Sequence, residues 1–225
     1  MTIAVRGEGS SDIGFLDNDL FIKGPMIILL EKLQCYKKLL ELLGFDDGFD
    51  INDFVTYSYI TKHEIEPKEK IVALRGKKEP DLKNKKFYIK SKAFAQIAKT
   101  KEADIAIFFS DQDKDNFIDR YIPINAGLKS GGYDKRGIAM IPTRISEAWL
   151  LCCLDYLNCQ KYESYTTDKD SPNYPKRLCD RSGKNRFEIA KECDPNQINM
   201  PSFNVFKKDF SEAVNDYLGY QVCEV

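Results

Sequence analysis

The chain has 225 residues, of which 43% are hydrophobic, and its 34 basic and 35 acidic side chains give a formal net charge of −1. This length and composition predict one packed domain with a substantial core. The balanced charge excludes attraction of nucleic acid or a membrane by net charge alone, so a site for a polyanion has to be a local basic patch or a bound cation.

The N-terminal half is predicted to begin with a buried strand over residues 2–7, because this run is apolar, β-branched and ends at glycine. A turn and a helix over residues 24–44 follow. A second strand is predicted over residues 53–60. The charged stretch 62–92 is less regular, and residues 68–76 could form a further strand within it.

The C-terminal half continues the alternation. A helix over residues 91–101 leads into residues 103–110, a continuous apolar run that is typical of a central parallel strand. A further helix, a fourth buried strand and three more helices are then predicted, with a polar loop over residues 160–182 before the last two helices. Their ranges are 116–132 for the helix, 136–142 for the strand, and 143–157, 184–193 and 202–218 for the later helices, the last capped by Ser202.

Strands that alternate with helices predict an α/β fold with a mostly parallel, Rossmann-like sheet flanked by helices and joined by right-handed crossovers. The predicted organisation is a core over residues 1–154, with an insertion around residues 62–92. Residues 155–225 are predicted to form a loop and a helical C-terminal extension that packs on this core.

Acidic residues follow three of the predicted strands. Glu8 follows the first, Asp111, Asp113 and Asp115 follow the central one, and Glu147 begins the helix after the fourth. Ligands of open parallel sheets bind beyond the carboxyl ends of the strands, so we expect these carboxylates to converge. Two unit charges about 4 Å apart repel by roughly 4 kcal/mol at an effective dielectric near 20, so such a cluster must take up protons or bind cations.

Clustered oxygen ligands suit Mg²⁺ or Mn²⁺ better than zinc. In an extended segment, alternate residues point the same way, so Asp111 and Asp113 could reach one ion together. A second ion about 3.5–4 Å away would give the two-metal arrangement of phosphodiester chemistry. Four alternatives remain open: a solvated acidic loop, a Glu8 that only forms a turn, a Glu147 that only favours the helix dipole, and a phosphatase-like aspartyl nucleophile. An EF-hand fits poorly, because Asn116 and Ile122 stand where it needs glycine and glutamate.

The order of these motifs resembles the Toprim domain, the catalytic fold of topoisomerases, bacterial primases and OLD-type nucleases. The stretch "VRGEGSSD" matches its first motif, a strand that ends in Glu-Gly with an acid further on, and supplies Glu8 and Asp12. The stretch "IFFSDQDKD" matches its second motif, a strand that ends in Asp-x-Asp, and supplies Asp111 and Asp113, with Asp115 as an extra acid.

OLD-like members of the family add a glutamate at the start of a later helix, which "RISEAWLL" matches with Glu147. The stretches "MIPTRISEAWLLC", "YPKRL" and "MPSFNVFKKDF" also look like parts of small stand-alone Toprim proteins encoded near phage-defence ATPases. The resemblance spans roughly Met1–Leu154. The segment between the two acidic motifs is longer than in a minimal Toprim domain, hence the insertion predicted above.

The resemblance implies a nuclease that hydrolyses DNA or RNA phosphodiester bonds with two Mg²⁺ or Mn²⁺ ions, in phage defence and with a partner ATPase. Glu8 would be the general acid/base or a ligand that positions water, Asp111 and Asp113 would hold metal, and Asp12 and Glu147 would complete a second metal site. Two other functions stay open: a non-catalytic partner subunit of this fold, and a phosphotransferase that uses Asp111 covalently. A homo-oligomer is also compatible with the resemblance.

Nucleic acid has two candidate contact regions. The stretch from Lys77 to Lys92 has seven lysines against two acids, with Phe87 and Tyr88 among them, so its lysines could neutralise phosphates while the rings stack on bases. The second region is a basic cluster. The alternative for both is a solvated charged surface. Lys85, Lys86 and Lys90 are the candidates in the first region, and the second contains Lys176, Arg177, Arg181, Lys184 and Arg186. Arg144, three residues before Glu147, would stabilise charge on a bound phosphate.

The cysteine pattern predicts neither a zinc site nor a disulfide framework. There are seven cysteines and one histidine, and no Cys-x-x-Cys occurs. We expect reduced thiols that pack as small hydrophobes. No basic segment followed by an apolar core begins the chain, and no apolar run approaches the roughly 20 residues of a membrane helix, so the expected protein is cytoplasmic and not membrane-bound.

Overall fold

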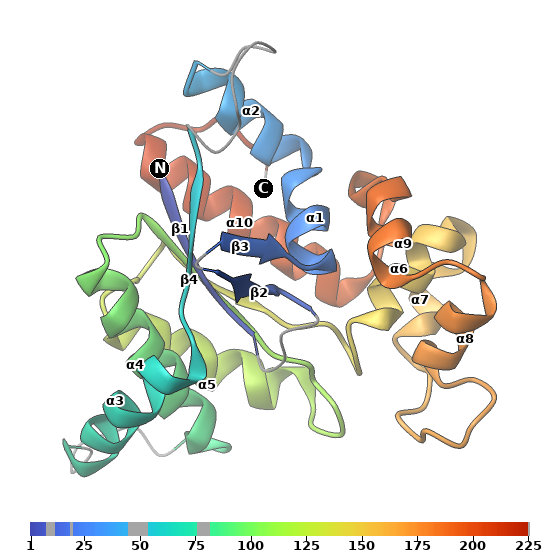
Figure 1. Ribbon diagram of the computed structural model, residues 1–225, viewed down its shortest axis with the longest axis horizontal. Helices are drawn as coiled ribbons and strands as arrows, with labels where there is room; N and C mark the ends of the chain where they lie inside the picture. Colours follow the sequence, from blue (N-terminus) through green and yellow to red (C-terminus); the bar gives the residue numbers. More distant parts are fainter. Residues whose placement is uncertain (8–11, 19, 45–53, 76–81, 225) are drawn as a thin grey trace.

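The computed structural model describes residues 1–7, 12–18, 20–44, 54–75 and 82–224. Its centre is a four-stranded parallel sheet in the order β4-β1-β5-β6 (Figure 1). The predicted α/β class with a parallel, Rossmann-like sheet flanked by helices is confirmed. The four strands are β1 (Thr2–Arg6), β4 (Thr56–Tyr59), β5 (Ile105–Phe109) and β6 (Gly137–Met140).

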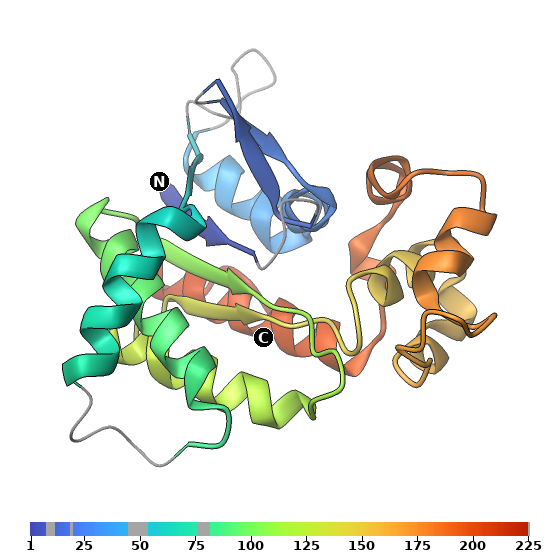
Figure 2. The ribbon, with the colours of Figure 1, turned by 60° about the horizontal axis from the view of Figure 1, so that its bottom comes forward.

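Alternation along the strands gives the sheet two apolar faces. In β5, Ile105, Ile107 and Phe109 belong to one core, while Ala106 and Phe108 belong to the other. Helices cover both sides of the sheet (Figure 2). The second core is covered by α3 (Lys62–Arg75), α4 (Lys85–Thr100) and α5 (Phe117–Ser130), and the first by α1 (Pro25–Glu31), α2 (Gln34–Leu42) and α10 (Pro201–Leu218).

Short helices lie beyond the carboxyl ends of β5 and β6 (Figures 1 and 2). From there α10 returns along the sheet. Trp149 of α6 is fully buried, with its ring 4.7 Å from that of Phe203, and its indole nitrogen donates a 2.8 Å hydrogen bond to Ser202. Residues from both predicted parts of the chain therefore share one core. The short helices are α6 (Glu147–Leu154), η2 (Tyr156–Asn158), α7 (Cys159–Tyr162), α8 (Pro175–Arg181), α9 (Arg186–Glu192) and η3 (Pro195–Gln197).

Some predicted elements are wrong in detail. The further strand expected over residues 68–76 is helix as far as Arg75. The single helix expected over residues 24–44 is two helices, interrupted at Lys32 and Leu33. Residues before it form a hairpin that we did not predict, of β2 (Gly14–Asp17) and β3 (Leu20–Lys23).

The predicted cap of the last helix is also wrong. Met200 is the N-cap of α10 and Pro201 its first helical residue, which suits a residue without an N–H group. Ser202 is buried instead. Its backbone N–H and its hydroxyl both bind the Glu163 carboxylate, at 2.8 and 2.6 Å. The hydroxyl therefore serves tertiary packing and not the end of the helix.

Six cysteines are paired, contrary to the expected reduced thiols. The fold brings together cysteines that the sequence separates by up to 188 residues, a proximity that linear spacing does not show. The disulfides are Cys35–Cys223, Cys152–Cys159 and Cys153–Cys193, and Cys179 is a buried free thiol. Among the helices of the described residues, none has the length and apolarity needed to cross a membrane.

Candidate acidic centre at the carboxyl end of the sheet

The loops after β5 and β6 run side by side and position the first acid. The N–H of Gln112 donates to the carbonyl of Pro142 at 3.1 Å, and that of Asp113 to the carbonyl of Arg144 at 2.8 Å. Asp113 and Arg144 both have left-handed backbones, with φ of 53° and 70°. These turns bring the start of α6 beside the first loop, where the Ser146 N–H donates to Asp111 Oδ1 at 2.8 Å.

Three carboxylates that are remote in sequence meet around Ser146. Its hydroxyl lies 2.5 Å from Asp12 Oδ1 and 3.4 Å from Glu147 Oε2, while its N–H binds Asp111. Asp12 and Glu147 are only 8% and 6% exposed. The N-terminal dipole of α6 favours negative charge at this point. The fold thus gathers Asp12, Asp111 and Glu147. Strand positions predicted the approach of Asp111 and Glu147, whereas Asp12 was expected only from the family resemblance.

Arg186 supplies positive charge inside this cluster. It is the first residue of α9, whose N-cap Asn185 forms a capping box with Glu188. Its guanidinium contacts Asp12 Oδ1, donates to Ser146 Oγ at 2.7 Å, and places Nε 3.4 Å from Glu147 Oε1. Burial lowers the pKa of Arg186, but the carboxylates of Glu147 and Asp12 raise it, and the net pKa is above the ordinary value.

The repulsion within this cluster opposes ionisation of Asp111. Burial, together with the nearby charges of Asp12, Glu147 and Asp113, raises the pKa of Asp111 to about 8, although the hydrogen bond from Ser146 lowers it. One arginine therefore does not compensate the three carboxylates. The cluster is receptive to further positive charge, either a proton or a cation.

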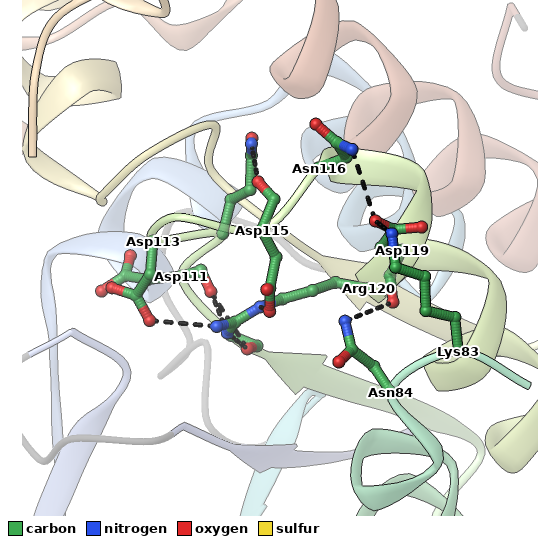
Figure 3. Close-up of polar contacts among 10 residues, drawn as sticks. Lys83, Asn84, Asp111, Asp113, Asp115, Asn116, Asp119 and Arg120 are labelled. Atoms are coloured by element: carbon green, nitrogen blue, oxygen red, sulfur yellow. Dashed lines mark hydrogen bonds and ion pairs between the residues drawn. The ribbon is translucent and has the colours of Figure 1, made fainter.

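Asp113 and Asp115 form ion pairs with a second arginine (Figure 3). Arg120 of α5 binds Asp113 Oδ2 through Nη2 at 3.0 Å and Asp115 Oδ2 through Nε at 3.1 Å. Its Nη1 donates to Ser110 Oγ at 2.7 Å, and its guanidinium lies 4.3 Å from the centre of the Phe87 ring. The loop turns at Asp113, whose φ is 53°, so the expected extended Asp-x-Asp segment is wrong.

A hard divalent cation needs several oxygen ligands around one point. In the described part of the chain, no three Asp, Glu, His or Cys side chains are close enough to hold a metal ion together. Glu8, the predicted general acid/base or ligand, lies outside the described residues. The chemistry of Asp12, Asp111 and Glu147 nevertheless fits Mg²⁺ or Mn²⁺, because all three offer carboxylate oxygens and their charge is only partly compensated.

The predicted basic residues fall into two groups. Lys85 and Lys86 lie in the first turn of α4 and Lys90 one turn later, while Lys176 and Arg177 lie in α8. Arg177 donates to the carbonyl of Asp170 at 3.0 Å. Of these five residues, Lys86 lines a pocket together with the acidic loop.

Lys86 borders a pocket of about 390 Å³ beside that loop. The same pocket is lined by Lys114, Lys169, Arg120 and Tyr174, and by Asp113 and Asp115. Burial raises the pKa of the Tyr174 hydroxyl, and the charges of Glu147, Asp111 and Asp113 raise it further. Tyr174 thus lies within the electrostatic reach of the acidic cluster.

Arg144 lies at the junction of the two loops through its backbone. Its Nε is buried and has no hydrogen-bond partner among the described residues. A buried, unpaired guanidinium nitrogen is costly in the absence of an anion. This observation agrees with the predicted contact of Arg144 with phosphate and does not test it.

Sequence reasoning missed three side chains that organise the centre: Ser146, Arg120 and Arg186. The first two had a local signal, because each lies within a few residues of a predicted acid or its loop. Arg186 is 174 residues from Asp12, and only its membership of a basic cluster marked it. Comparisons of the chain with family models, with curated proteins and with solved structures give no significant match.

Proposed function

We propose that the protein is a metal-dependent hydrolase of nucleic-acid phosphodiester bonds, of the Toprim and OLD-like kind. The observation that carries the proposal is the convergence of Asp12, Asp111 and Glu147, with the pKa of Asp111 raised to about 8. An excess of buried negative charge at the carboxyl end of a parallel sheet suits a site for hard cations.

Each side chain would have a separate role in such a site. Asp12, Asp111 and Glu147 would hold Mg²⁺ or Mn²⁺, and Ser146 would fix their orientation through its hydroxyl and its N–H. When bound, the cations would supply Lewis acidity at the phosphate. Arg144 would bind a non-bridging phosphate oxygen, and Arg120 would hold Asp113 and Asp115 in place. Glu8 would assist proton transfer.

The pocket beside the acidic loop supports a nucleic-acid substrate. Lys86, Lys114 and Lys169 could each neutralise a phosphate, and Tyr174 offers a ring on which a base can stack. The phage-defence role and the partner ATPase rest on the family resemblance alone.

The proposal is tested by incubating the purified protein with plasmid DNA and with structured RNA in Mg²⁺ or Mn²⁺. Asp111→Asn and Glu147→Gln should each lower the cleavage rate by about 100-fold or more, since each removes a carboxylate ligand. Asp134→Asn is the matched control, because Asp134 is 61% exposed in its ion pair with Lys129 before β6. Equal cleavage by all four proteins would exclude the acidic centre as the catalytic site.

One observation favours a second candidate, the non-catalytic binding module. Arg186 and Arg120 already pair with four of the acids, as they would in a structural ion-pair network. A folded wild-type protein without metal-stimulated cleavage, alone or with a co-purified partner, would support this candidate.

A further inference from the structure

A second, basic pocket lies on the face of the sheet covered by α2 and α10. Its volume is about 320 Å³, which is at the lower end of the range for small-molecule sites. Its walls are formed by the start of α2, the middle of α10 and the C-terminal segment that follows α10, residues 219–224. The lining residues include Lys38, Lys207 and Lys208, and also Gln34, Asn196 and Asn204.

Positive charge exceeds negative charge in this lysine pocket. Glu224 is the only acid among the lining residues, against the three lysines. Lys208 also has Glu212 as a partner, at 3.7 Å across one helical turn. Lys38 has no ion-pair or hydrogen-bond partner among the described residues. Among the described lining residues, positive charge therefore exceeds negative charge.

Lys207 is the member with the most restricted surroundings. Its amino group donates to the carbonyl of Ile198 at 3.0 Å and lies 5.6 Å from the centre of the Phe203 ring, and no carboxylate of the described residues pairs with it. Burial lowers the pKa of this amino group. A partly buried ammonium with only a carbonyl and a ring as partners gains from the approach of an anion.

The walls of the pocket are fixed by several covalent and polar links. The disulfide Cys35–Cys223 joins the start of α2 to the C-terminal segment. Asn215 of α10 accepts from the N–H groups of Val222 and Cys223, at 2.8 and 2.9 Å. The Gln34 N–H donates to Asn196 Oδ1 at 2.9 Å. The lysines are thus presented by elements that hold their positions before a ligand arrives, which lowers the cost of binding.

We propose that the lysine pocket binds a small phosphorylated molecule, with the phosphate groups between Lys38, Lys207 and Lys208. Lysine binds phosphate as a point charge, and three lysines suit the multiple charges of a diphosphate better than a single carboxylate. Gln34 also lines the pocket, and its side-chain amide can donate to a remaining oxygen. This site is separate from the acidic centre and does not depend on its function.

The test titrates inorganic pyrophosphate into the full-length protein by calorimetry, with EDTA present so that no cation bridges it to the acidic centre. Saturable binding should be weakened by about tenfold or more in Lys38→Gln/Lys207→Gln, since two charge-assisted contacts are lost. Lys129→Gln/Lys135→Gln is the matched control, because both lysines are exposed, with 68% and 74% of their side chains accessible. Equal affinity of the two double variants, or no saturable binding by the wild type, would overturn the proposal.

A second measurement works on the wild-type chain alone. Acylation of lysines with a limiting reagent, followed by mass spectrometry, should show that pyrophosphate protects Lys38, Lys207 and Lys208 more than Lys129. Equal reactivity with and without pyrophosphate would contradict binding at this place. A short oligothymidylate that competes at equal phosphate concentration would assign the pocket to a nucleic-acid backbone and would overturn the small-molecule proposal.

Discussion

Asp111 is the residue at which the environment opposes ionisation most clearly. Its carboxyl is held by the Ser146 N–H, yet burial and three neighbouring acids outweigh that hydrogen bond and raise its pKa to about 8. Arg186 reaches Asp12 and Glu147 and leaves Asp111 as the carboxyl that carries the remaining repulsion. The ionisation of Asp111 should therefore make the free energy of unfolding depend on both pH and added cation.

Without divalent cations, Asp111→Asn should flatten the pH dependence of the free energy of unfolding. The folded pKa of about 8 exceeds the unfolded value near 4, so the folded protein binds the extra proton between these pH values and becomes less stable as pH rises through them. Asparagine has no such proton to lose. The variant should gain stability relative to wild type at pH 9 and not at pH 4, in urea unfolding with EDTA.

Urea unfolding with a divalent cation in place of EDTA tests whether the cation binds the ionised Asp111. Mg²⁺ or Mn²⁺ should stabilise the wild type more at pH 9 than at pH 5, because only the ionised carboxyl is a ligand. It should stabilise Asp111→Asn less at pH 9. Asp134→Asn serves as the surface control and should keep the wild-type slope. If the free energy of unfolding of Asp111→Asn depended on pH as steeply as that of the wild type, the repulsion between carboxylates would lie at other residues.

At the scale of elements, the strands were the most predictable part of the fold. The runs that became β1, β5 and β6 are apolar on both faces because helices cover both sides of the sheet, and such runs are visible in a sequence. Their order along the chain also placed Asp111 and Glu147 at one edge, while Asp12 was indicated only by the family resemblance and Glu8 lies outside the described residues. The approach of Asp111 and Glu147 was thus predictable, while the chemistry of the acids stays a prediction.

Other elements depend on contacts that a local pattern does not contain. The many charged residues of α3 obscure the apolar periodicity of a helix. The hairpin of β2 and β3 turns at Asn18, whose φ is 47°. Arg186 and the disulfide partners come from distant parts of the chain. Their positions follow from packing, and no spacing rule connects them to the residues they meet.

Helices α4 and α5 pack closely at Gly127, and this contact gives an element-scale prediction. A Cβ at Gly127 would lie 2.0 Å from Ser91 Oγ and 2.5 Å from the Tyr88 carbonyl oxygen. Gly127→Ala should therefore destabilise the protein by about 1–3 kcal/mol, although alanine normally stabilises a helix interior. Urea unfolding measures the change.

The double variant Ser91→Ala/Gly127→Ala separates the two contacts. It removes the Ser91 hydroxyl that blocks the new methyl group, but the Tyr88 carbonyl belongs to the backbone of α4 and remains. We expect only partial recovery relative to Ser91→Ala alone. A Gly127→Ala protein as stable as wild type would show that the two helices are not packed as closely as described.

At the scale of the whole molecule, three disulfides link segments that the sheet does not connect. Cys35–Cys223 joins α2 to the C-terminal segment across 188 residues, and Cys153–Cys193 joins α6 to the end of α9. Through this second link the helix that carries Arg186 is tied to the helix that begins with Glu147. Disulfides are rare in reducing compartments, so the thiol state bears directly on the expected cytoplasmic location.

The number of free thiols in the protein can be measured. After denaturation without reductant, alkylation and mass spectrometry should find one reactive thiol, Cys179, and seven after reduction. In the oxidised protein, Cys35→Ser/Cys223→Ser should lower the free energy of unfolding by about 2–5 kcal/mol, because the unfolded chain loses the constraint of a long loop. Cys179→Ala is the control for removal of a buried thiol without loss of a cross-link. Seven reactive thiols without reductant, and equal stability of the double variant and wild type, would return all the cysteines to the reduced state that the sequence predicted, and the walls of the lysine pocket would then depend on the contacts of Asn215 and Asn196 alone.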